Sequence, residues 1–340
     1  MTKYNLSLLG FGNVGRALAR LLLRKRETLQ AEYGITFSFT GIATGSKGRA
    51  VDPGGLDVEK ALALVDAGES IAGLSRSPVA DNFDFIARSE ANVLFENTPV
   101  NYASGQPAVD HIRAALRMGM HAVTANKGPV VHALDELTDL AAASGVRFFY
   151  EGTVMDGAPI FSLFRGALPA VEVRAIKGVL NSTTNLMLDR MEAGDSFDRA
   201  VAAAQAIGVA ETDPSGDVDG WDAAIKIAAL ASVLMGVRLK PVDVDRVGIR
   251  GIGPDEIAGA KVEGKRWKLV CTAEREGATV RARVAPELVG VESPMYGVAG
   301  TTSIVQFETD VLGRLSIVEE DPGKETTAYG LLADFIHAVK

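Results

Sequence analysis

A glycine-rich hexapeptide near the amino terminus constrains the fold of this chain more than any other feature. It reads Gly10-Phe11-Gly12-Asn13-Val14-Gly15, directly after the strand-like run Asn5–Leu9 and at the start of the helical pattern Val14–Lys25. In this position the first glycine permits a tight turn, the second lets the main chain approach a pyrophosphate, and the third lets helix and strand pack closely. The unpaired N–H groups of the helix start also attract phosphate. A tight turn without a ligand is the alternative, but the context favours a dinucleotide site.

Strand-like runs alternate with helical patterns through the first 150 residues. The expected strands are Asn5–Leu9, Thr36–Ala43, Val93–Phe95, His121–Thr124 and Arg147–Tyr150. The expected helices are Val14–Lys25, Leu56–Ala67, Pro107–Met118 and Ala133–Ala143, and Gly45–Gly55 is expected to be a loop. Strands separated by helices of this length predict an α/β fold with a doubly wound parallel sheet of Rossmann type.

The pattern changes after Tyr150. A long strand, Val171–Leu180, is expected to enter a polar turn, Asn181–Asn185. Helices are then expected at Asn185–Ala193, Phe197–Ile207 and Asp219–Met235, and strands at Trp267–Ala273, Thr279–Val284, Ser303–Glu308 and Arg314–Val318. These elements predict an α+β domain with a mixed sheet. We expect a dinucleotide-binding domain over residues 1–150, joined by the carboxyl-terminal helix in 322–340, and a second domain over 151–321.

Composition excludes several classes of protein. The net charge of −8 argues against a nucleic-acid partner, because phosphate binding needs a basic surface. The longest apolar run, Ile227–Val237, is too short to span a bilayer, and no signal peptide is expected before the first strand. The single cysteine, Cys271, favours a reducing compartment such as the cytoplasm. Zinc is not expected, because the histidines are scattered, at His111, His121, His132 and His337.

The end of the second strand normally distinguishes the two nicotinamide cofactors, because an acidic residue there binds the ribose 2′-hydroxyl of NAD. Here the segment Ala43–Arg49 has no carboxylate and contains two cations, Lys47 and Arg49. Both cations would attract the 2′-phosphate of NADP. The alternative is that they are solvated loop charges. The segment therefore favours NADP over NAD.

The stretch Gly208–Lys226 is the most informative part of the second half. Its carboxylates are those of Glu211, Asp213, Asp217, Asp219 and Asp222. Asp222 and Lys226 are four residues apart and share one face of a helix. An acidic helix start with an exposed ion pair is one interpretation. The other is function, because the helix is otherwise almost entirely apolar, and a lysine desolvated within it needs a partner and becomes suited to proton transfer.

Lys127 is a second candidate for a role in chemistry. It follows the expected strand His121–Thr124, at the carboxyl end where doubly wound sheets bind their ligands. A lysine in a surface loop is the alternative, and this residue alone does not decide between them.

Several of these segments together resemble the homoserine dehydrogenase family. The match takes in Asn97–Pro99, His121–Pro129, Glu151–Pro159, Lys177–Asn185 and nearly all of Gly208–Lys226. The segments occur in the family's order and cover nearly the whole chain. The resemblance implies an NAD(P)-dependent oxidoreductase that interconverts L-homoserine and L-aspartate 4-semialdehyde in the synthesis of threonine and methionine.

The resemblance also implies roles for individual residues. Lys226, beside Asp222, would donate the proton in aldehyde reduction and accept it in alcohol oxidation. Glu211 and Asp222 would hold the amino group or the hydroxyl of the substrate. Gly208 would add a backbone contact, and Asp217 would support the loop.

Cofactor contacts and a cation site follow from the same resemblance. Lys127 would lie near the nicotinamide and the substrate oxygen, where it would aid binding or share in proton transfer. Asn97 and Thr98 would contact the nicotinamide half of the cofactor. The family also binds a monovalent cation, usually sodium, through main-chain carbonyls, and the matching positions are Glu151, Val154, Asp156 and Ala158.

This chain departs from the family's pattern at two places. Ser182 stands where the family has glycine in its Asn-Gly-Thr-Thr/Ser-Asn turn. Only Gly323 and Thr327-Ala328 remain of a glycine-rich cofactor loop near the carboxyl terminus, and the acidic residues around them could repel phosphates or point away. Gly323 stays a candidate cofactor contact. The resemblance further implies a homodimer formed through the second domain, and no regulatory domain is expected.

Two other interpretations stay open at this point. The departures could suit an oxidoreductase that acts on another short amino alcohol. The chain could also be a catalytically silent homologue that binds the cofactor, although the presence of Glu211, Asp222, Lys226 and Lys127 argues against this, because a binding module needs no such set.

Overall fold

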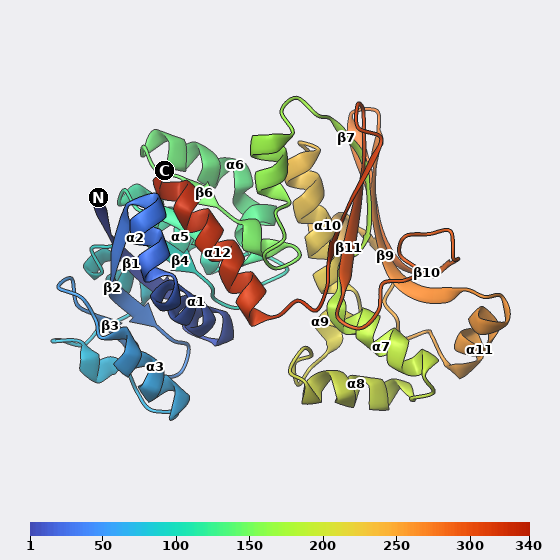
Figure 1. Ribbon diagram of the computed structural model, residues 1–340, viewed down its shortest axis with the longest axis horizontal. Helices are drawn as coiled ribbons and strands as arrows, with labels where there is room; N and C mark the ends of the chain where they lie inside the picture. The colour runs from blue at the N-terminus through green and yellow to red at the C-terminus, as the bar shows by residue number, and fades with distance from the viewer. The chain divides into compact units, whose positions relative to one another are not determined.

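The computed structural model describes residues 1–340, which fold into two units (Figure 1). The first comprises Met1–Pro159 together with Gly323–Lys340, and the second comprises Ile160–Pro322. The first unit thus extends beyond Tyr150, where the sequence placed its end. The additional segment lies against the last helix so closely that a Cβ atom on Gly157 would be 2.3 Å from the Thr326 carbonyl oxygen.

A six-stranded sheet in the order β3-β2-β1-β4-β5-β6 forms the centre of the first unit. Its strands are β1 (Thr2–Leu9), β2 (Ile35–Ala43), β3 (Arg49–Val51), β4 (Val93–Glu96), β5 (His121–Thr124) and β6 (Phe148–Phe149). All neighbours pair in parallel except β2 and β3. The strand order reverses at β1 and β4, which is where doubly wound sheets bind ligands. The predicted Rossmann-type sheet is confirmed.

Helices surround this sheet and close its core. They are α1 (Asn13–Arg24), α2 (Arg26–Tyr33), α3 (Val58–Asp66), α4 (Asn82–Arg88), α5 (Ala108–Arg117), α6 (Lys127–Ala143) and α12 (Lys324–Val339). The carboxyl-terminal helix α12 lies beside α1 (Figure 1). Its Phe335 is fully buried and packs edge-on against Phe95 of β4, with ring centroids 6.0 Å apart. This aromatic contact anchors the end of the chain to the first sheet.

Two local predictions in the first unit were wrong, and helices α2 and α4 were not predicted. The segment Gly45–Gly55 is not all loop, because its residues Arg49–Val51 form β3 against the end of β2. The helix expected from Ala133 begins at Lys127, with non-helical backbone at Ala133 (φ −146°), so two helical segments join there. Helix α2 was not expected, since it buries only Leu29 and shows little amphipathic periodicity.

The second unit contains a six-stranded mixed sheet in the order β12-β11-β7-β9-β10-β8. Its strands are β7 (Val173–Val179), β8 (Asp245–Arg246), β9 (Arg266–Glu276), β10 (Thr279–Val289), β11 (Ser303–Thr309) and β12 (Arg314–Glu319). All neighbours are antiparallel except β8 and β10. The predicted mixed sheet is confirmed.

The helices of the second unit are α7 (Ser182–Glu192), α8 (Phe197–Ala206), α9 (Ser215–Val218), α10 (Trp221–Leu234) and α11 (Pro254–Val262). Helix α10 packs against β7, β9 and β10, which explains why most of its residues are apolar and buried. The predicted polar turn at Asn181–Asn185 is instead the start of α7, because the Asn181 side chain caps the helix by accepting the N–H of Thr184 at 2.8 Å. None of the helices in the structure is long and apolar enough to cross a membrane.

Candidate active site

The hexapeptide Gly10–Gly15 forms the turn between β1 and α1, and its three glycines differ in their surroundings. Gly10 has φ +104°, and a Cβ atom there would lie 2.3 Å from the Asn97 carbonyl oxygen. A Cβ on Gly15 would lie 2.4 Å from the Gly10 carbonyl oxygen. A Cβ on Gly12 would meet nothing within 4 Å, so the main chain there borders open space. This cradle at the start of a helix suits the pyrophosphate of a dinucleotide.

The two cations expected near the cofactor differ in their surroundings. The Lys47 ammonium donates to the Gly68 carbonyl at 2.6 Å. Arg49 lies opposite Ala43, the last residue of β2, and its Nε donates to Asn82 Oδ1 at 2.8 Å. The terminal amino groups of Arg49 make no contact with a protein acceptor. Arg49 is therefore better placed than Lys47 to bind an anion at the end of β2.

Three predicted cofactor residues gather at the carboxyl edge of the first sheet. Asn97 and Thr98 follow β4, and Lys127 is the first residue of α6, just after β5. Asn126 connects the two loops, because its Nδ2 donates to the Thr98 carbonyl at 2.9 Å. The Thr98 hydroxyl donates to the carboxylate of Glu96. The Nδ2 of Asn97 is buried and has no hydrogen-bond partner, so an acceptor on a ligand could satisfy it.

Gly323 caps the amino terminus of α12. Its N–H donates to the Thr326 hydroxyl at 2.9 Å, and its carbonyl accepts the same hydroxyl at 2.6 Å. A Cβ atom on Gly323 would meet nothing within 4 Å. The turn is thus closed by its own residues, and nothing at Gly323 itself obstructs a ligand.

The predicted cation positions lie in the irregular segment that follows β6. Met155 and Asp156 have left-handed backbone, with φ of 51° and 50°. The main-chain carbonyls of Val154, Asp156 and Ala158 accept no hydrogen bond from the protein. No cluster of three or more His, Cys, Asp or Glu side chains suited to a metal is present.

The second unit brings a separate cluster of charged and polar groups together. Lys226 of α10 forms an ion pair with Asp222, with Nζ 2.8 Å from Oδ2. The same ammonium donates to the Leu180 carbonyl at 2.8 Å. Asn181 bridges two carboxylates, donating from Nδ2 to Asp217 Oδ1 at 2.6 Å and to Asp222 Oδ2 at 3.0 Å. The expectation that Asp222 and Lys226 share one helical face is confirmed.

Burial and like charge act together on this cluster. The Asp222 and Lys226 side chains are 13% and 15% exposed, so the pair is largely desolvated. Burial, together with the nearby charge of Asp222, raises the pKa of Asp217 from 3.8 to about 6. Asn181 and Lys226 partly offset this effect. Two carboxylates that share one amide and one ammonium leave local negative charge, which suits a substrate that carries an ammonium group.

Two predicted substrate residues do not join the cluster. The Glu211 side chain is exposed, while its main-chain carbonyl accepts from Gln205 Nε2 at 3.0 Å. Gly208 has φ +77° and ends the turn after α8, with open space where a Cβ would be. Both residues therefore belong to the surface loop that leads into α9.

The sequence assigned no role to several residues that complete the cluster. Asn181 caps α7 with its Oδ1 and uses its Nδ2 to bridge the two aspartates. The Thr183 hydroxyl donates to the Val209 carbonyl at 3.0 Å. The sequence could have indicated both residues, because several hydroxyl and amide residues in succession directly follow the buried end of a strand.

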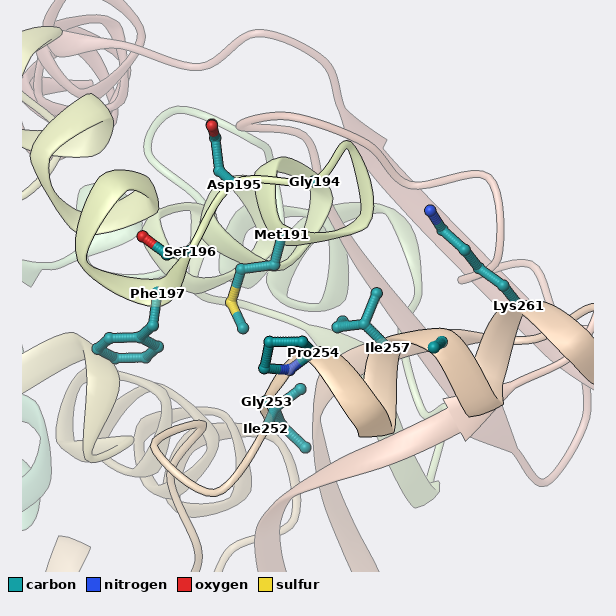
Figure 2. Close-up of a pocket in the computed structure, with 11 residues that line it drawn as sticks. Met191, Gly194, Asp195, Ser196, Phe197, Ile252, Gly253, Pro254, Ile257 and Lys261 are labelled. Carbon is teal, nitrogen blue, oxygen red and sulfur yellow. The ribbon is translucent and has the colours of Figure 1, made fainter.

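A pocket of about 370 Å³ also occurs in the second unit, between the turn that joins α7 to α8 and helix α11 (Figure 2). Met191, Pro254 and Ile257 give it an apolar lining (Figure 2). None of the cluster residues lines it. Its two charged residues, Asp195 and Lys261, already have partners, because Asp195 forms ion pairs with Arg190 and Arg199 and the Lys261 ammonium donates to the Glu192 carbonyl at 2.5 Å. The Lys226 cluster, rather than this pocket, is therefore the candidate site.

Sequence comparison identifies the family of the chain. The sequence profile of the homoserine dehydrogenase NAD-binding domain matches residues 10–151, and that of the homoserine dehydrogenase domain matches residues 159–336. The chain belongs to the homoserine dehydrogenase family. Members of this family are NAD(P)-dependent oxidoreductases, so the family and the enzyme class expected from the sequence are confirmed.

Individual relatives cover the chain almost completely. The NAD(+)-dependent homoserine dehydrogenase of Pseudomonas canavaninivorans is 36% identical, over 99% of this chain and 96% of that protein. The homoserine dehydrogenase structure from Thiobacillus denitrificans has a TM-score of 0.84 and 28% identity, over 99% of this chain and 73% of the other. A hyperthermophilic archaeal homoserine dehydrogenase mutant in complex with NADPH has a TM-score of 0.83 and 28% identity, over 99% and 98% of the two chains.

Proposed function

We propose that the cluster around Lys226 binds homoserine and its aldehyde and performs the proton transfer between them. The observation that carries this proposal is the ion pair of Lys226 and Asp222 at 2.8 Å, in a largely buried environment. A lysine held by a carboxylate and a carbonyl has a defined direction for its proton, which general acid and base catalysis requires.

The proton steps follow from these contacts. In aldehyde reduction, the Lys226 ammonium donates a proton to the developing alkoxide and stabilises its charge beforehand. In alcohol oxidation, the neutral Lys226 amine accepts the hydroxyl proton. The carboxylates of Asp222 and Asp217 attract the substrate's ammonium group, and Asn181 keeps both carboxylates in place. Glu211, on the neighbouring loop, adds charge for the same ammonium, and Gly208 adds a backbone contact.

The first unit supplies the cofactor site in this proposal. When bound, the nicotinamide ring takes or gives the hydride. The N–H groups at the start of α1 and the cradle of Gly10–Gly15 hold the pyrophosphate. The residues that hold the nicotinamide half are Asn97, Thr98 and Lys127, with Lys127 also close to the substrate oxygen. Gly323, at the start of α12, borders the cofactor.

NADP is the preferred cofactor in this proposal. The end of β2 offers no carboxylate for a ribose 2′-hydroxyl, and the terminal amino groups of Arg49 make no hydrogen bond to a protein acceptor. A guanidinium suits a phosphate because two of its N–H groups can bind two oxygens. Lys47 adds positive charge nearby while bonded to Gly68.

A monovalent cation, a homodimer and a reducing compartment complete the proposal. The unpartnered carbonyls of Val154, Asp156 and Ala158, with that of Glu151, would hold sodium, and replacing sodium by N-methylglucamine should then lower the melting temperature. The homodimer would form through the second unit, where Val311 on the β11–β12 turn is 68% exposed, and sedimentation would measure its mass. The buried thiol of Cys271 suits the cytoplasm.

Replacing Lys226 tests the central step. Lys226→Ala should lower kcat for homoserine oxidation by about 10²–10⁴-fold and leave the Kd for the cofactor unchanged, because the cofactor cradle lies in the other unit. Lys226→Arg keeps the charge beside Asp222 but does not release its proton at neutral pH, so it should be nearly as slow. Lys177→Ala, which removes an ion pair with Glu287 in the same unit, is the control. Unchanged turnover in Lys226→Ala would refute the assigned role.

A further inference from the structure

A chain of hydrogen bonds in the first unit has no part in the proton transfer proposed above. Glu96, the last residue of β4, is fully buried, and its Oε1 lies 3.3 Å from Nδ1 of His111 in α5, which is 1% exposed. Nε2 of His111 lies 3.1 Å from Nδ2 of Asn82, the first residue of α4. Oδ1 of Asn82 accepts from Arg49 Nε at 2.8 Å. At the other end, the Thr98 hydroxyl donates to Glu96.

The direction of each bond follows from its neighbours. A guanidinium only donates, so Asn82 must present its oxygen to Arg49 and its NH₂ to His111. Nε2 of His111 therefore accepts, and its proton is on Nδ1, from which it donates to Glu96. Turning the Asn82 amide over would place its NH₂ against the Arg49 N–H and break the first bond. Glu96 and His111 thus determine how Asn82 is oriented, and Asn82 determines where Arg49 points.

The hydrogen-bonded chain from Arg49 to Glu96 lies among apolar side chains, where burying polar groups costs free energy. The apolar cluster at this edge includes Leu9, Ala43, Phe85, Leu94 and Ala115. A buried carboxylate without enough hydrogen bonds is destabilising, and Oε2 of Glu96 has no partner. Apolar side chains would fill the same space at lower cost. The polar chain is therefore better explained by what it holds at its two ends.

The position of Arg49 shows what the outer end serves. Arg49 pairs with Ala43, and the Ala43 carbonyl accepts the N–H groups of Gly10 and Phe11 at 3.1 and 2.8 Å. Arg49 thus lies beside the glycine turn, at the strand end where Rossmann folds distinguish the ribose substituents. With Nε bonded to Asn82, its two terminal amino groups form a fork without a protein acceptor. Such a fork matches two oxygens of a phosphate.

We propose that Asn82 is a positioning residue for cofactor specificity, held in one orientation by His111 and Glu96 so that Arg49 presents its fork to the 2′-phosphate of NADP. The same Glu96 holds Thr98, so one buried carboxylate supports residues at both ends of the cofactor site. This inference rests on the proposed preference for NADP, since it concerns how Arg49 achieves that preference.

Direct binding measurements on single and double variants test the proposal. The Kd values of NADP and NAD would be measured by calorimetry for the wild type, Asn82→Ala, Arg49→Ala and the double variant. Because Asn82→Ala removes the hydrogen bond that orients the Arg49 guanidinium, it should weaken the binding of NADP by about tenfold relative to that of NAD. In the Arg49→Ala background, Asn82→Ala should change the ratio by less than about twofold.

Two further variants separate positioning from folding. His111→Gln offers an amide oxygen near the place of Nε2 and should preserve the preference, whereas His111→Leu should lower it as Asn82→Ala does. Asn92→Ala is the matched control, because Asn92 accepts the Asn5 N–H at 2.7 Å, beside the amino end of β4, away from the cofactor edge. Its NADP to NAD ratio should equal that of the wild type.

The outcomes distinguish this inference from the cofactor proposal. If Arg49→Ala lowers the preference but Asn82→Ala does not, the positioning role is wrong and the NADP preference stands. If Asn82→Ala lowers the ratio of NADP to NAD affinity by the same factor in the Arg49→Ala background as in the wild type, the positioning role is also wrong. If Arg49→Ala leaves the ratio unchanged, both the proposed preference through Arg49 and this inference are overturned.

Discussion

The raised pKa of Asp217 leads to a test of the cluster in the second unit. Burial and the charge of Asp222 raise this pKa from 3.8 to about 6, so ionised Asp217 is less stable in the folded protein than in the unfolded chain. Asp217→Asn is a close mimic of the protonated acid. Its amide oxygen can still accept from Asn181, so the hydrogen bond is retained and only the charge is removed.

The sign and size of the effect follow from linkage. Because the folded-state pKa is the higher one, the stability contributed by this group is fully present below pH 3.8 and is lost as the pH rises through about 6. The full loss is about 3 kcal/mol, from about 1.36 kcal/mol for each pH unit between the two values. Between pH 5 and pH 8 the loss is about 1.4 kcal/mol. Asp217→Asn should not show this loss.

Urea unfolding at pH 5 and pH 8, followed by tryptophan fluorescence, would measure the difference. Trp221 and Trp267 both lie in the second unit, so the signal reports on the unit that contains Asp217. The free energy of unfolding of Asp217→Asn, relative to that of the wild type, should be about 1.4 kcal/mol higher at pH 8 than at pH 5.

Asp213→Asn is the matched control on the same loop. Asp213 is exposed, and the Ser215 N–H lowers its pKa, so its ionisation is complete well below pH 5. Its effect on stability should therefore be the same at both pH values. If Asp217→Asn behaves like Asp213→Asn, the carboxylate is not desolvated, and the proposed charge balance around Lys226 is wrong.

Further predictions concern the glycine turn and a buried lysine. Gly10→Ala should lower the stability of the first unit by more than about 2 kcal/mol, because the new Cβ would meet the Asn97 carbonyl at 2.3 Å. Gly12→Ala should keep the wild-type melting temperature, because its Cβ meets nothing within 4 Å, but it should weaken the binding of NAD and of NADP measured by calorimetry. Wild-type cofactor affinity in Gly12→Ala would contradict the proposed approach of the pyrophosphate. Lys268→Met should cost about 3 kcal/mol in urea unfolding, because Lys268 is fully buried and bonds Asn185 at 2.7 Å and the Val298 carbonyl at 2.5 Å. A loss below about 1 kcal/mol would show that the site adapts to an apolar side chain.

Local sequence patterns determined much of the fold. The glycine spacing of Gly10–Gly15 specified a strand, a tight turn and a helix, because Gly10 takes a positive φ in the turn and Gly15 packs closely against the Gly10 carbonyl. The alternation of strands and helices specified the parallel sheet, since parallel neighbours need helical connections. The pairing of Asp222 with Lys226 also followed from sequence, because helical geometry alone brings residues four apart together.

Elements without a strong local pattern were decided by tertiary contacts. Strand β3 is only Arg49–Val51, and it exists because the end of β2 offers unpaired backbone groups. Helix α2 buries one leucine and shows no clear apolar stripe, so its periodicity could not indicate it. The polar segment at Asn181 looked like a turn, because the same side chains that favour turns also cap helices.

In the candidate site, too, the sequence indicated the residue types and the tertiary structure decided their contacts. Its residue types were evident in the sequence, but Asn181, Asp217 and Asp222 come from three different elements, and only the packing of the second unit brings them within hydrogen-bond distance. The chain from Arg49 to Glu96 likewise joins β3, α4, α5 and β4. Periodicity reports which face of an element is buried. It does not report which polar groups meet there, because that depends on contacts between residues far apart in the chain.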